Sequence, residues 1–262
     1  MKTTQPIEYT WFRNGTAEVV PAEIIVEKPV SLTVNGKAWL TLMCTPVHLE
    51  ALAVGFLFNE GFIKSMDEVA DLRPCENGEN IDVWLTHSVK QPKNWRKTSG
   101  CTGGVTSQVE SRPQTARQTN GACVTPAQVT TLAAKLFETQ DLYKQTGGVH
   151  TSALSDGEEI VLAAEDIGRH NTLDKIAGLY LMQKPELAHK ILLTTGRISS
   201  EMIQKAAKIG ASIVISRTSP SSLSVQIAER EGITLIGYAR RDRFTVYAHP
   251  QRILVTERTG QP

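Results

Sequence analysis

The sequence predicts an α/β protein, and two features of its second half carry this prediction. From residue 160 onward, apolar segments with strand character alternate with segments of helical periodicity. Such alternation is typical of a largely parallel sheet with helical crossovers. Four of the strand-like segments, 160–164, 191–195, 212–216 and 234–237, also run into polar turns that contain arginine. Because the carboxyl ends of parallel strands line the ligand crevice of such folds, these turns predict one site for a bulky polyanion.

The composition narrows the class of protein. The chain has 262 residues, 40% of them hydrophobic, which suffices for two modest domains or one large domain and excludes a disordered protein. A formal net charge of +1 provides no global field for nucleic acid or an acidic membrane, so we expect neither as a partner. Between residues 197 and 243, however, eight Lys or Arg residues stand against four Asp or Glu residues. This local excess suits a compact anion.

The amino terminus and the cysteines indicate a cytoplasmic protein. The first eight residues contain no apolar signal core, and no apolar run approaches the ~20 residues that span a bilayer. The four cysteines, Cys44, Cys75, Cys101 and Cys123, are widely spaced and form no Cys-x-x-Cys pair. We therefore expect reduced thiols and no zinc site. Cys44 follows a strand and is expected in the core, whereas Cys75 and Cys123 fall in turns.

The first structured block, residues 19–85, is predicted to contain a hairpin and a helix. Alternating apolar residues mark strands at residues 30–34 and 38–42. We prefer a three-residue loop, 35–37, to a two-residue Asn35-Gly36 turn, because the longer loop places both apolar sets on one face. The helix is predicted to have Thr45 as N-cap, Pro46 as its first residue and Gly61 just past its end. Its apolar face comprises Leu49, Leu52, Ala53, Phe56 and Leu57.

A polar segment, residues 88–120, shows neither helical nor strand periodicity and is predicted to separate two domains, residues 1–115 and 116–262. The second domain is predicted to open with a helix capped by Thr125 and Pro126. Its inward residues are Val129, Leu132, Ala133, Leu136 and Phe137. Further helices are predicted at residues 171–182, 199–209 and 221–231, with Gly210 and Gly232 ending the last two.

Cys101 lies in the polar segment and is a candidate reactive thiol. Structural cysteines normally have apolar neighbours, and this one does not. Arg96 and Lys97 favour a thiolate, and three nearby glycines let backbone N–H groups approach an anionic sulfur. The same residues also fit an inert cysteine in a flexible linker, so both interpretations stay open.

Two polar turns contain candidate ligand contacts. The candidates are Asp166, Arg169, His170 and His150. Asp166 or Glu165 is predicted to bind hydroxyl groups or base edges. Arg169 and His170 are predicted to face phosphate. The alternative is a salt-bridged helix cap with Asn171 as N-cap and Asp174 paired to a lysine. For His150 the alternative is a core histidine with internal hydrogen bonds.

The remaining turns add further candidates for binding phosphate. Arg197 and Arg217 lie beside serines that open helices, Ser219 among them, and helix N-termini bind anions. The next turn contributes Tyr238, Ala239, Arg240, Arg241, Asp242 and Arg243. In the functional interpretation, the arginines bind pyrophosphate and a purine stacks on Tyr238 or Phe244. An exposed charged hairpin is the alternative.

These segments together resemble the FdhD family, the formate dehydrogenase accessory sulfurtransferases. The similar stretches follow the family order and cover most of the chain. They are residues 43–46 through 59–62, Ser99-Gly100-Cys101, 146–154, 164–178 and 195–243. The resemblance implies a cytidine-deaminase-like three-layer domain preceded by a smaller α/β-roll-like domain. It also implies a homodimer.

The resemblance further implies a cytoplasmic sulfurtransferase that works through a cysteine persulfide. Such a protein takes sulfur from a cysteine desulfurase and passes it to the molybdenum or tungsten bis-guanine-dinucleotide pterin cofactor before this cofactor enters formate dehydrogenase. Cys101 would carry the persulfide, and residues 238–243 would contact the cofactor. The molybdenum cofactor, Mo-bis-molybdopterin guanine dinucleotide, is then a bound substrate that GDP mimics, and no permanent cofactor is expected.

One departure from the family pattern is Gly104, where many members carry the second cysteine of a Cys-x-x-Cys motif. A single sulfur still carries a persulfide, but an internal disulfide is in doubt. The chain also lacks the His-x-Glu and Pro-Cys-x-x-Cys elements of zinc deaminases, so the fold does not imply deamination.

A non-covalent chaperone of the pterin cofactor is the main rival function. A nucleotide-dependent oxidoreductase or hydrolase is weaker, because no P-loop or Gly-x-Gly-x-x-Gly turn is present.

Overall fold

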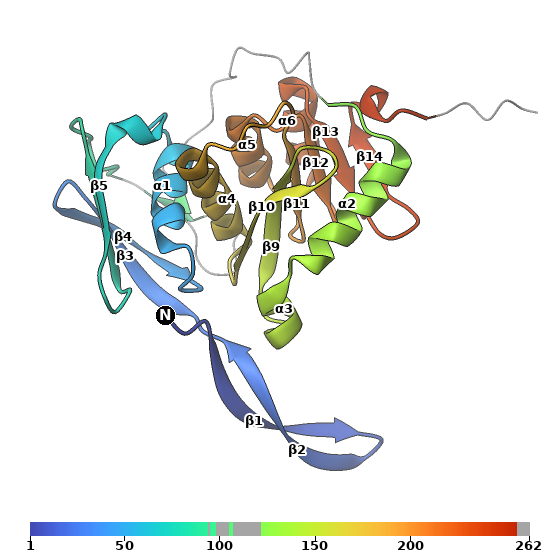
Figure 1. Ribbon diagram of the computed structural model, residues 1–262, viewed down its shortest axis with the longest axis horizontal. Helices are drawn as coiled ribbons and strands as arrows, with labels where there is room; N and C mark the ends of the chain where they lie inside the picture. Colours follow the sequence, from blue (N-terminus) through green and yellow to red (C-terminus); the bar gives the residue numbers. More distant parts are fainter. Residues whose placement is uncertain (94, 98–104, 107–121, 256–262) are drawn as a thin grey trace, which may run out of the picture. The chain divides into compact units, whose positions relative to one another are not determined.

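The protein has a mixed α/β fold, as the sequence predicts, and its chain divides into two compact units (Figure 1). The computed structural model describes residues 1–93, 95–97, 105–106 and 122–255. The first unit comprises residues 1–108, 140–151 and 164–184, and the second comprises 109–139, 152–163 and 185–262. The chain therefore passes between the units several times, whereas the sequence suggested a single boundary near residue 115.

The first unit is built on a four-stranded sheet with the order β4-β3-β6-β5. Its strands are β3 (Lys28–Val34), β4 (Lys37–Cys44), β5 (Val69–Pro74) and β6 (Asn80–Leu85). Helix α1 (Leu49–Glu60) and the short 3-10 helix η1 (Met66–Glu68) belong to the same unit. The buried core combines alternate strand residues with α1 and includes Val30, Leu32, Val34, Leu52, Phe56, Leu57, Ile81 and Val83. This is the alternation expected of a sheet with one buried face.

The β3–β4 hairpin corrects the predicted loop length. Asn35 and Gly36 form a two-residue turn and both have positive φ, 48° and 74°, which a type I′ turn requires. The register then shifts, so that Leu32 pairs with Leu40 and Trp39 has no residue opposite. The bulge shifts the register of β4 by one residue, which is the shift that the three-residue loop was expected to produce. Trp39 is buried as a result.

Helix α1 begins later than predicted and ends as predicted. Its N-cap is His48, with φ 51°, and its C-cap is Gly61, with φ 85°. Thr45, expected as the N-cap, is instead fully buried. Its N–H donates to the Asp166 carboxylate at 3.1 Å, and its hydroxyl accepts from the Ile167 N–H at 3.1 Å. The cap-like residue therefore has partners more than 100 residues away in the chain.

Helix α4 (Arg169–Gln183) crosses α1 at backbone contact. A Cβ atom on Gly55 would overlap the carbonyl oxygen of Asp174, and one on Gly178 would overlap that of Ala51. Only glycine fits at these two positions, because the helices approach more closely than any side chain allows. This crossing explains why α4 belongs to the first unit, although it follows strand β10 in the chain.

A buried ion pair lies at the start of α4. The Lys175 ammonium is 2.6 Å from the Asp166 carboxylate, and both side chains are fully buried. The ammonium also donates to the carbonyl oxygens of Thr45 and Glu165, each at 3.0 Å. The carboxylate also accepts from the Gly168 N–H and from the Asn171 side-chain amide. Each charge is therefore surrounded by hydrogen bonds, as a buried ion pair requires.

The second unit contains most of a six-stranded sheet with the order β10-β9-β11-β12-β13-β14. Its strands are β9 (His150–Ser155), β10 (Ile160–Asp166), β11 (Ile191–Thr194), β12 (Ile213–Ser216), β13 (Thr234–Gly237) and β14 (Thr245–Ala248). The three strands β11, β12 and β13 are parallel, whereas β9 and β14 run antiparallel to their neighbours β11 and β13. The prediction of a largely parallel sheet is thus confirmed for its centre, and β9 and β14 are antiparallel strands that the sequence analysis did not predict.

The main helices of the second unit are capped by the residues that the sequence predicted. They are α2 (Pro126–Glu138), α5 (Ser200–Ile209), α6 (Ser222–Glu231) and the 3-10 helix η2 (Pro250–Arg252). Thr125 and Gln128 form a capping box on α2, Ser199 and Ser221 cap α5 and α6, and Gly210 and Gly232 end them. Phe137, predicted to face inward, is 47% exposed. Among the described residues, no helix has the length and apolar character needed to cross a membrane.

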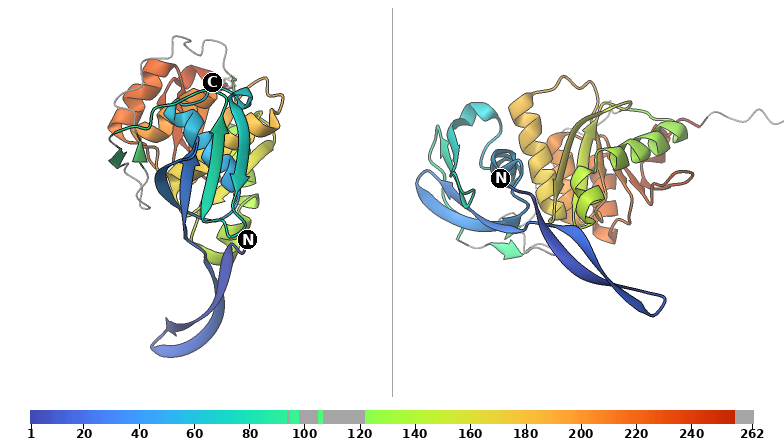
Figure 2. Two further views of the ribbon diagram at one scale, coloured as in Figure 1. Left: turned by 90° about the vertical axis from the view of Figure 1, so that its left-hand side faces the viewer. Right: turned by 60° about the horizontal axis from the view of Figure 1, so that its bottom comes forward.

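An amino-terminal arm completes the first unit. Strands β1 (Thr4–Arg13) and β2 (Thr16–Ile25) pair along their whole length and form a sheet of their own (Figure 2). Helix α3 (Asp141–Thr146) contacts β2. Nothing in the sequence analysis predicted this arm, because its apolar residues alternate too weakly with polar ones.

Replacing Asp166 tests the buried ion pair. Asp166→Ala is expected to lower the free energy of unfolding of the first unit by about 3–5 kcal/mol, because the Lys175 ammonium is left buried and uncompensated. Urea denaturation followed by circular dichroism measures the change. Asp67→Ala is the matched control, since Asp67 pairs with Lys184 at 3.8 Å and both side chains are mostly exposed. It should cost less than about 1 kcal/mol. Equal urea midpoints for the two variants would contradict the assigned role.

Candidate functional site

The turns after β11, β12 and β13 lie together in the second unit. Parallel strands end at the same edge of a sheet, and main-chain hydrogen bonds continue beyond that edge from turn to turn. The Ile198 N–H donates to the Ser219 carbonyl at 3.2 Å, which joins the first turn to the second. The Tyr238 N–H donates to the Thr218 carbonyl at 3.0 Å, which joins the second turn to the third. The sequence-predicted juxtaposition of these three turns is therefore present.

Close packing of the second and third turns depends on Gly237. A Cβ atom there would lie 3.0 Å from the Thr218 carbonyl oxygen and 2.9 Å from the Tyr247 ring. Tyr238 follows with φ 52°, a left-handed conformation that is uncommon for a residue with a side chain. The Tyr238 side chain is 45% exposed, whereas Ala239 is buried. The backbone therefore projects the aromatic ring outward and turns the next residue into the core.

Five arginines with exposed side chains lie on these turns, and we call them the strand-end arginine cluster: Arg197, Arg217, Arg240, Arg241 and Arg243. Arg217 lies 5.8 Å from the centre of the Phe137 ring, so the exposed Phe137 serves as a cation–π partner. Within the described part of the chain, none of the five forms an ion pair. Asp242 is exposed beside them, and Ser219 is half-buried. A group of accessible guanidinium forks suits a ligand with several phosphate oxygens.

The candidates Asp166, Arg169, His170 and His150 lie in the first unit and are mostly withdrawn from solvent. Asp166 is fully buried in the ion pair with Lys175, and Arg169 and His170 are buried in the first turn of α4. His150 is half-buried at the start of β9. Their predicted contacts with a ligand stay predictions, and the described geometry gives Asp166 a structural role.

The predicted helix-cap alternative for this turn is wrong in detail. The N-cap of α4 is Gly168 rather than Asn171. The Asn171 amide donates to the Met43 carbonyl at 2.8 Å and to the Asp166 carboxylate at 2.9 Å. Asp174 accepts from the Asn59 amide at 2.7 Å. These polar residues hold α4 against β4 and α1, which is why the turn is so rich in them.

Cys101 lies outside the described residues, but the strands on either side of it are described. Strand β7 (Arg96–Lys97) pairs antiparallel with β8 (Val105–Thr106). Residues 98–104 thus connect two paired strands, and Cys101 is the central residue of that connection. The sequence analysis did not predict this hairpin stem, because two-residue strands are too short to show a period.

Both ends of the hairpin stem contact helix α1 or its neighbours. The Trp95 ring, next to β7, lies 5.8 Å from the Phe56 ring and 6.4 Å from the Trp39 ring. The Thr106 hydroxyl donates to the Glu60 carboxylate at 3.1 Å. Glu60, the last residue of α1, is only 6% exposed. A tryptophan within an otherwise polar segment was the signal in the sequence that these residues pack against the core.

The other three cysteines differ from one another in environment. Cys44 is fully buried, as predicted, and burial together with the nearby Asp166 charge raises the pKa of its thiol to about 12. The Cys75 sulfur is half-buried and accepts from the N–H groups of Glu79 and Asn80 at 3.2 and 3.0 Å. Cys123 is exposed. The protein therefore disfavours the thiolate form of Cys44.

The chain is similar to proteins named sulfur carrier protein FdhD. The one from Staphylococcus haemolyticus is 36% identical over 238 residues, which cover 89% of this chain and 90% of the relative. The one from Bacillus subtilis is 36% identical over 247 residues, which cover 92% of this chain and 94% of the relative.

A solved structure and a family model extend the similarity to the fold. The structure, from Desulfotalea psychrophila, is described as that of a formate dehydrogenase accessory protein. It has a TM-score of 0.77 and 28% identity, and covers 97% of this chain and 100% of its own. The model of the FdhD/NarQ family matches residues 25–254, which include most of both units and every candidate site residue. The chain therefore belongs to the FdhD/NarQ family.

Proposed function

We propose that this protein is a cytoplasmic sulfur carrier required for formate dehydrogenase activity. It takes persulfide sulfur from a cysteine desulfurase onto Cys101. It then passes this sulfur to the molybdenum or tungsten bis-guanine-dinucleotide cofactor, its bound substrate, before the cofactor enters formate dehydrogenase. The observation that carries the proposal is the strand-end arginine cluster, because five exposed guanidiniums on hydrogen-bonded turns match the pyrophosphates of such a cofactor.

The first step is a transfer between sulfur atoms. The Cys101 thiolate attacks the terminal sulfur of the donor's persulfide and forms a new S–S bond. The donor's S–S bond breaks, and the donor cysteine leaves as a thiolate, so no external oxidant is needed. Arg96 and Lys97 precede the connection that contains Cys101, and nearby positive charge lowers the free energy of a thiolate.

The second step delivers the sulfur to the substrate's metal. The Cys101 persulfide first loses its proton to solvent; its S–S bond then breaks, the terminal sulfur leaves as a neutral atom and Cys101 returns to a thiolate. A reduced metal in the bound substrate would supply the two electrons that convert this sulfur to sulfide. The protein contributes position. Guanidiniums of the cluster bind the pyrophosphates, and Tyr238 offers its exposed ring to a guanine. Holding both reactants in one complex converts an encounter into an intramolecular step.

A non-covalent chaperone of the pterin cofactor is the rival function. It requires the same arginines, so the cluster does not separate the two. The hairpin stem favours a role for the thiol, because the Trp95 contacts and the Thr106–Glu60 hydrogen bond fix both strands beside Cys101. A chaperone would not need such a support around one residue.

Replacing Cys101 separates the two functions. Incubation of the protein with a cysteine desulfurase and cysteine is expected to add one sulfur atom to Cys101, detected by mass spectrometry of the peptide. Cys101→Ala should remove this adduct and abolish maturation of formate dehydrogenase, because no other thiol replaces it. Cys123→Ala is the matched control, since Cys123 is also a free thiol and is exposed. Normal maturation with Cys101→Ala would establish the chaperone instead.

Replacing arginines of the cluster tests the binding site. Arg197→Ala and Arg240→Ala are each expected to weaken GDP binding about 10- to 100-fold in calorimetry, because each removes charge-assisted hydrogen bonds worth about 1.5–3 kcal/mol. Arg230→Ala is the control, since Arg230 pairs with Glu231 on helix α6 and lies outside the cluster. Cys101→Ala should also bind GDP normally. Unchanged affinity in both cluster variants would move the site elsewhere.

The hairpin stem offers a test of positioning. Thr106→Val removes the hydroxyl that donates to Glu60, whereas Thr106→Ser keeps it. We expect Thr106→Val to slow sulfur loading of Cys101 roughly tenfold, because losing a hydrogen bond to a charged group costs about 1.5–3 kcal/mol. Thr106→Ser should load normally, and both variants should bind GDP with unchanged affinity. Equal loading rates for the valine and serine variants would show that this hydrogen bond does not position the thiol.

A further inference from the structure

Ser216, the last residue of β12, places a fully buried hydroxyl between two turns of the strand-end arginine cluster. This hydroxyl donates to the Gly196 carbonyl at 2.8 Å and accepts from the Thr218 N–H at 3.0 Å. The Thr218 hydroxyl lies 3.1 Å away. Because a hydroxyl has one proton and two acceptor sites, the Thr218 hydroxyl donates to Ser216 and all three sites are occupied. One side chain therefore joins the turn after β11 to the turn after β12.

The first of these turns is held at Gly196, directly before Arg197. The Gly196 carbonyl accepts from Ser216, and the Gly196 N–H donates to the Thr194 hydroxyl at 3.1 Å. Thr194 is itself buried and accepts from the Ser152 hydroxyl at 3.0 Å. Buried hydroxyls on β9, β11 and β12 thus form one network that holds both polar backbone groups of this glycine.

The main chain at Ser216 extends the network to the third turn. The Ser216 carbonyl accepts from the Ala239 N–H at 3.0 Å. The next residue, Arg217, donates its N–H to the Thr194 carbonyl at 3.2 Å. Ser216 is therefore hydrogen-bonded to all three turns of the cluster, although a side chain without exposed surface cannot touch a ligand.

We infer that Ser216 is a positioning residue that sets the spacing of Arg197 and Arg217 for two linked phosphates. Arg197 follows the glycine that Ser216 holds, and Arg217 directly follows Ser216. A single phosphate needs the guanidinium of one turn, whereas a pyrophosphate spans two turns and depends on their separation. The inference rests on the proposed function, because it takes the cluster to be the pyrophosphate site.

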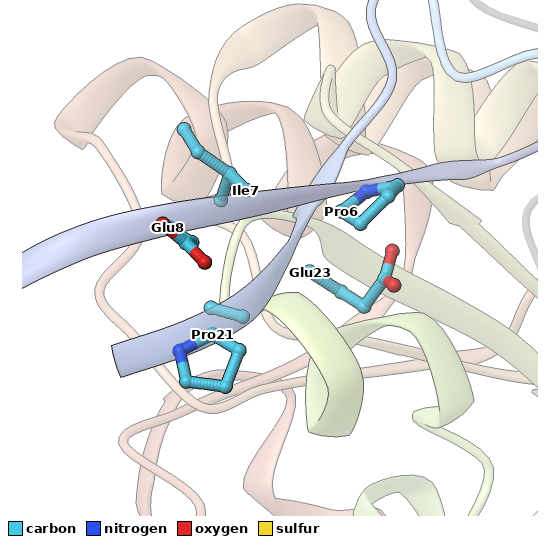
Figure 3. Close-up of a pocket in the computed structure, with 6 residues that line it drawn as sticks. Pro6, Ile7, Glu8, Pro21 and Glu23 are labelled. Carbon is cyan, nitrogen blue, oxygen red and sulfur yellow. The ribbon is translucent and has the colours of Figure 1, made fainter. Parts of the chain in front are cut away.

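A hollow on the amino-terminal arm provides a contrast in charge (Figure 3). Its lining residues are Pro6, Ile7, Glu8, Pro21, Ala22 and Glu23. The charged groups of this lining are the two carboxylates, which repel a pyrophosphate. Of these two surfaces, the strand-end arginine cluster is the one that suits a nucleoside diphosphate.

The ratio of GDP affinity to GMP affinity, measured by calorimetry on the full chain, tests the role of Ser216. Ser216→Ala is expected to weaken GDP binding about tenfold, because the turns lose their fixed separation and with it part of the charge-assisted hydrogen bonds. GMP binding should be unchanged, since each turn keeps its guanidinium groups.

Ser212→Ala is the matched control, because Ser212 directly precedes the same strand and is also buried. Its hydroxyl lies 3.5 Å from the Lys190 carbonyl and accepts from the Ala122 N–H at 3.3 Å, at the opposite end of β12. This control should lower the free energy of unfolding about as much as Ser216→Ala and should keep the wild-type ratio of affinities. A wild-type ratio for Ser216→Ala, or an equal fall for both variants, would overturn the inference and leave the binding site in place. Wild-type protein that binds neither nucleotide would refute the proposed binding site itself.

Amide hydrogen exchange, measured by NMR without nucleotide, provides a second test. In Ser216→Ala the amides of Gly196 and Thr218 should exchange faster than in the wild type, whereas Ser212→Ala should leave both rates unchanged. Gly196 is the informative residue, since its own acceptor, the Thr194 hydroxyl, is present in both variants. A wild-type exchange rate at Gly196 in Ser216→Ala would show that Ser216 does not hold the first turn.

Discussion

The crossing of α1 and α4 is the contact on which the first unit depends. Gly55 and Gly178 let the two backbones touch, and the buried Lys175–Asp166 pair holds the start of α4 to the turn after β4. Helix α1 in turn presents Phe56 to Trp95 and Glu60 to Thr106. The position of the hairpin stem therefore depends on this crossing. A larger residue at either glycine would move the helix that positions the hairpin stem.

The two units divide the residues of the proposed function between them. The first unit holds the hairpin stem beside Cys101, and the second unit displays the strand-end arginine cluster. Each uses a different means of placing its groups. The stem depends on side-chain contacts with a core helix, whereas the cluster depends on main-chain hydrogen bonds that continue from parallel strands. Substitutions should therefore affect sulfur loading and nucleotide binding separately.

Local signals in the sequence predicted local structure. Capping boxes and terminal glycines located α2, α5 and α6, and apolar runs located the central strands, because these features are decided by residues close in the chain. The same reasoning failed for Thr45 and Asp166. Both resemble residues of a cap or a ligand site, but they bond to each other across 121 residues. The bulge at Trp39 was missed because a bulge and a longer loop shift the register equally.

The cluster is the feature on which the proposed binding of a polyanion by a chain with a net charge of +1 depends. Main-chain hydrogen bonds from Tyr238 to Thr218 and from Ile198 to Ser219 hold together the three turns that carry the five arginines. Pyrophosphate oxygens would therefore meet these arginines without any need to reorganise the backbone. A fixed array of this kind gains affinity because the cost of ordering it is met during folding.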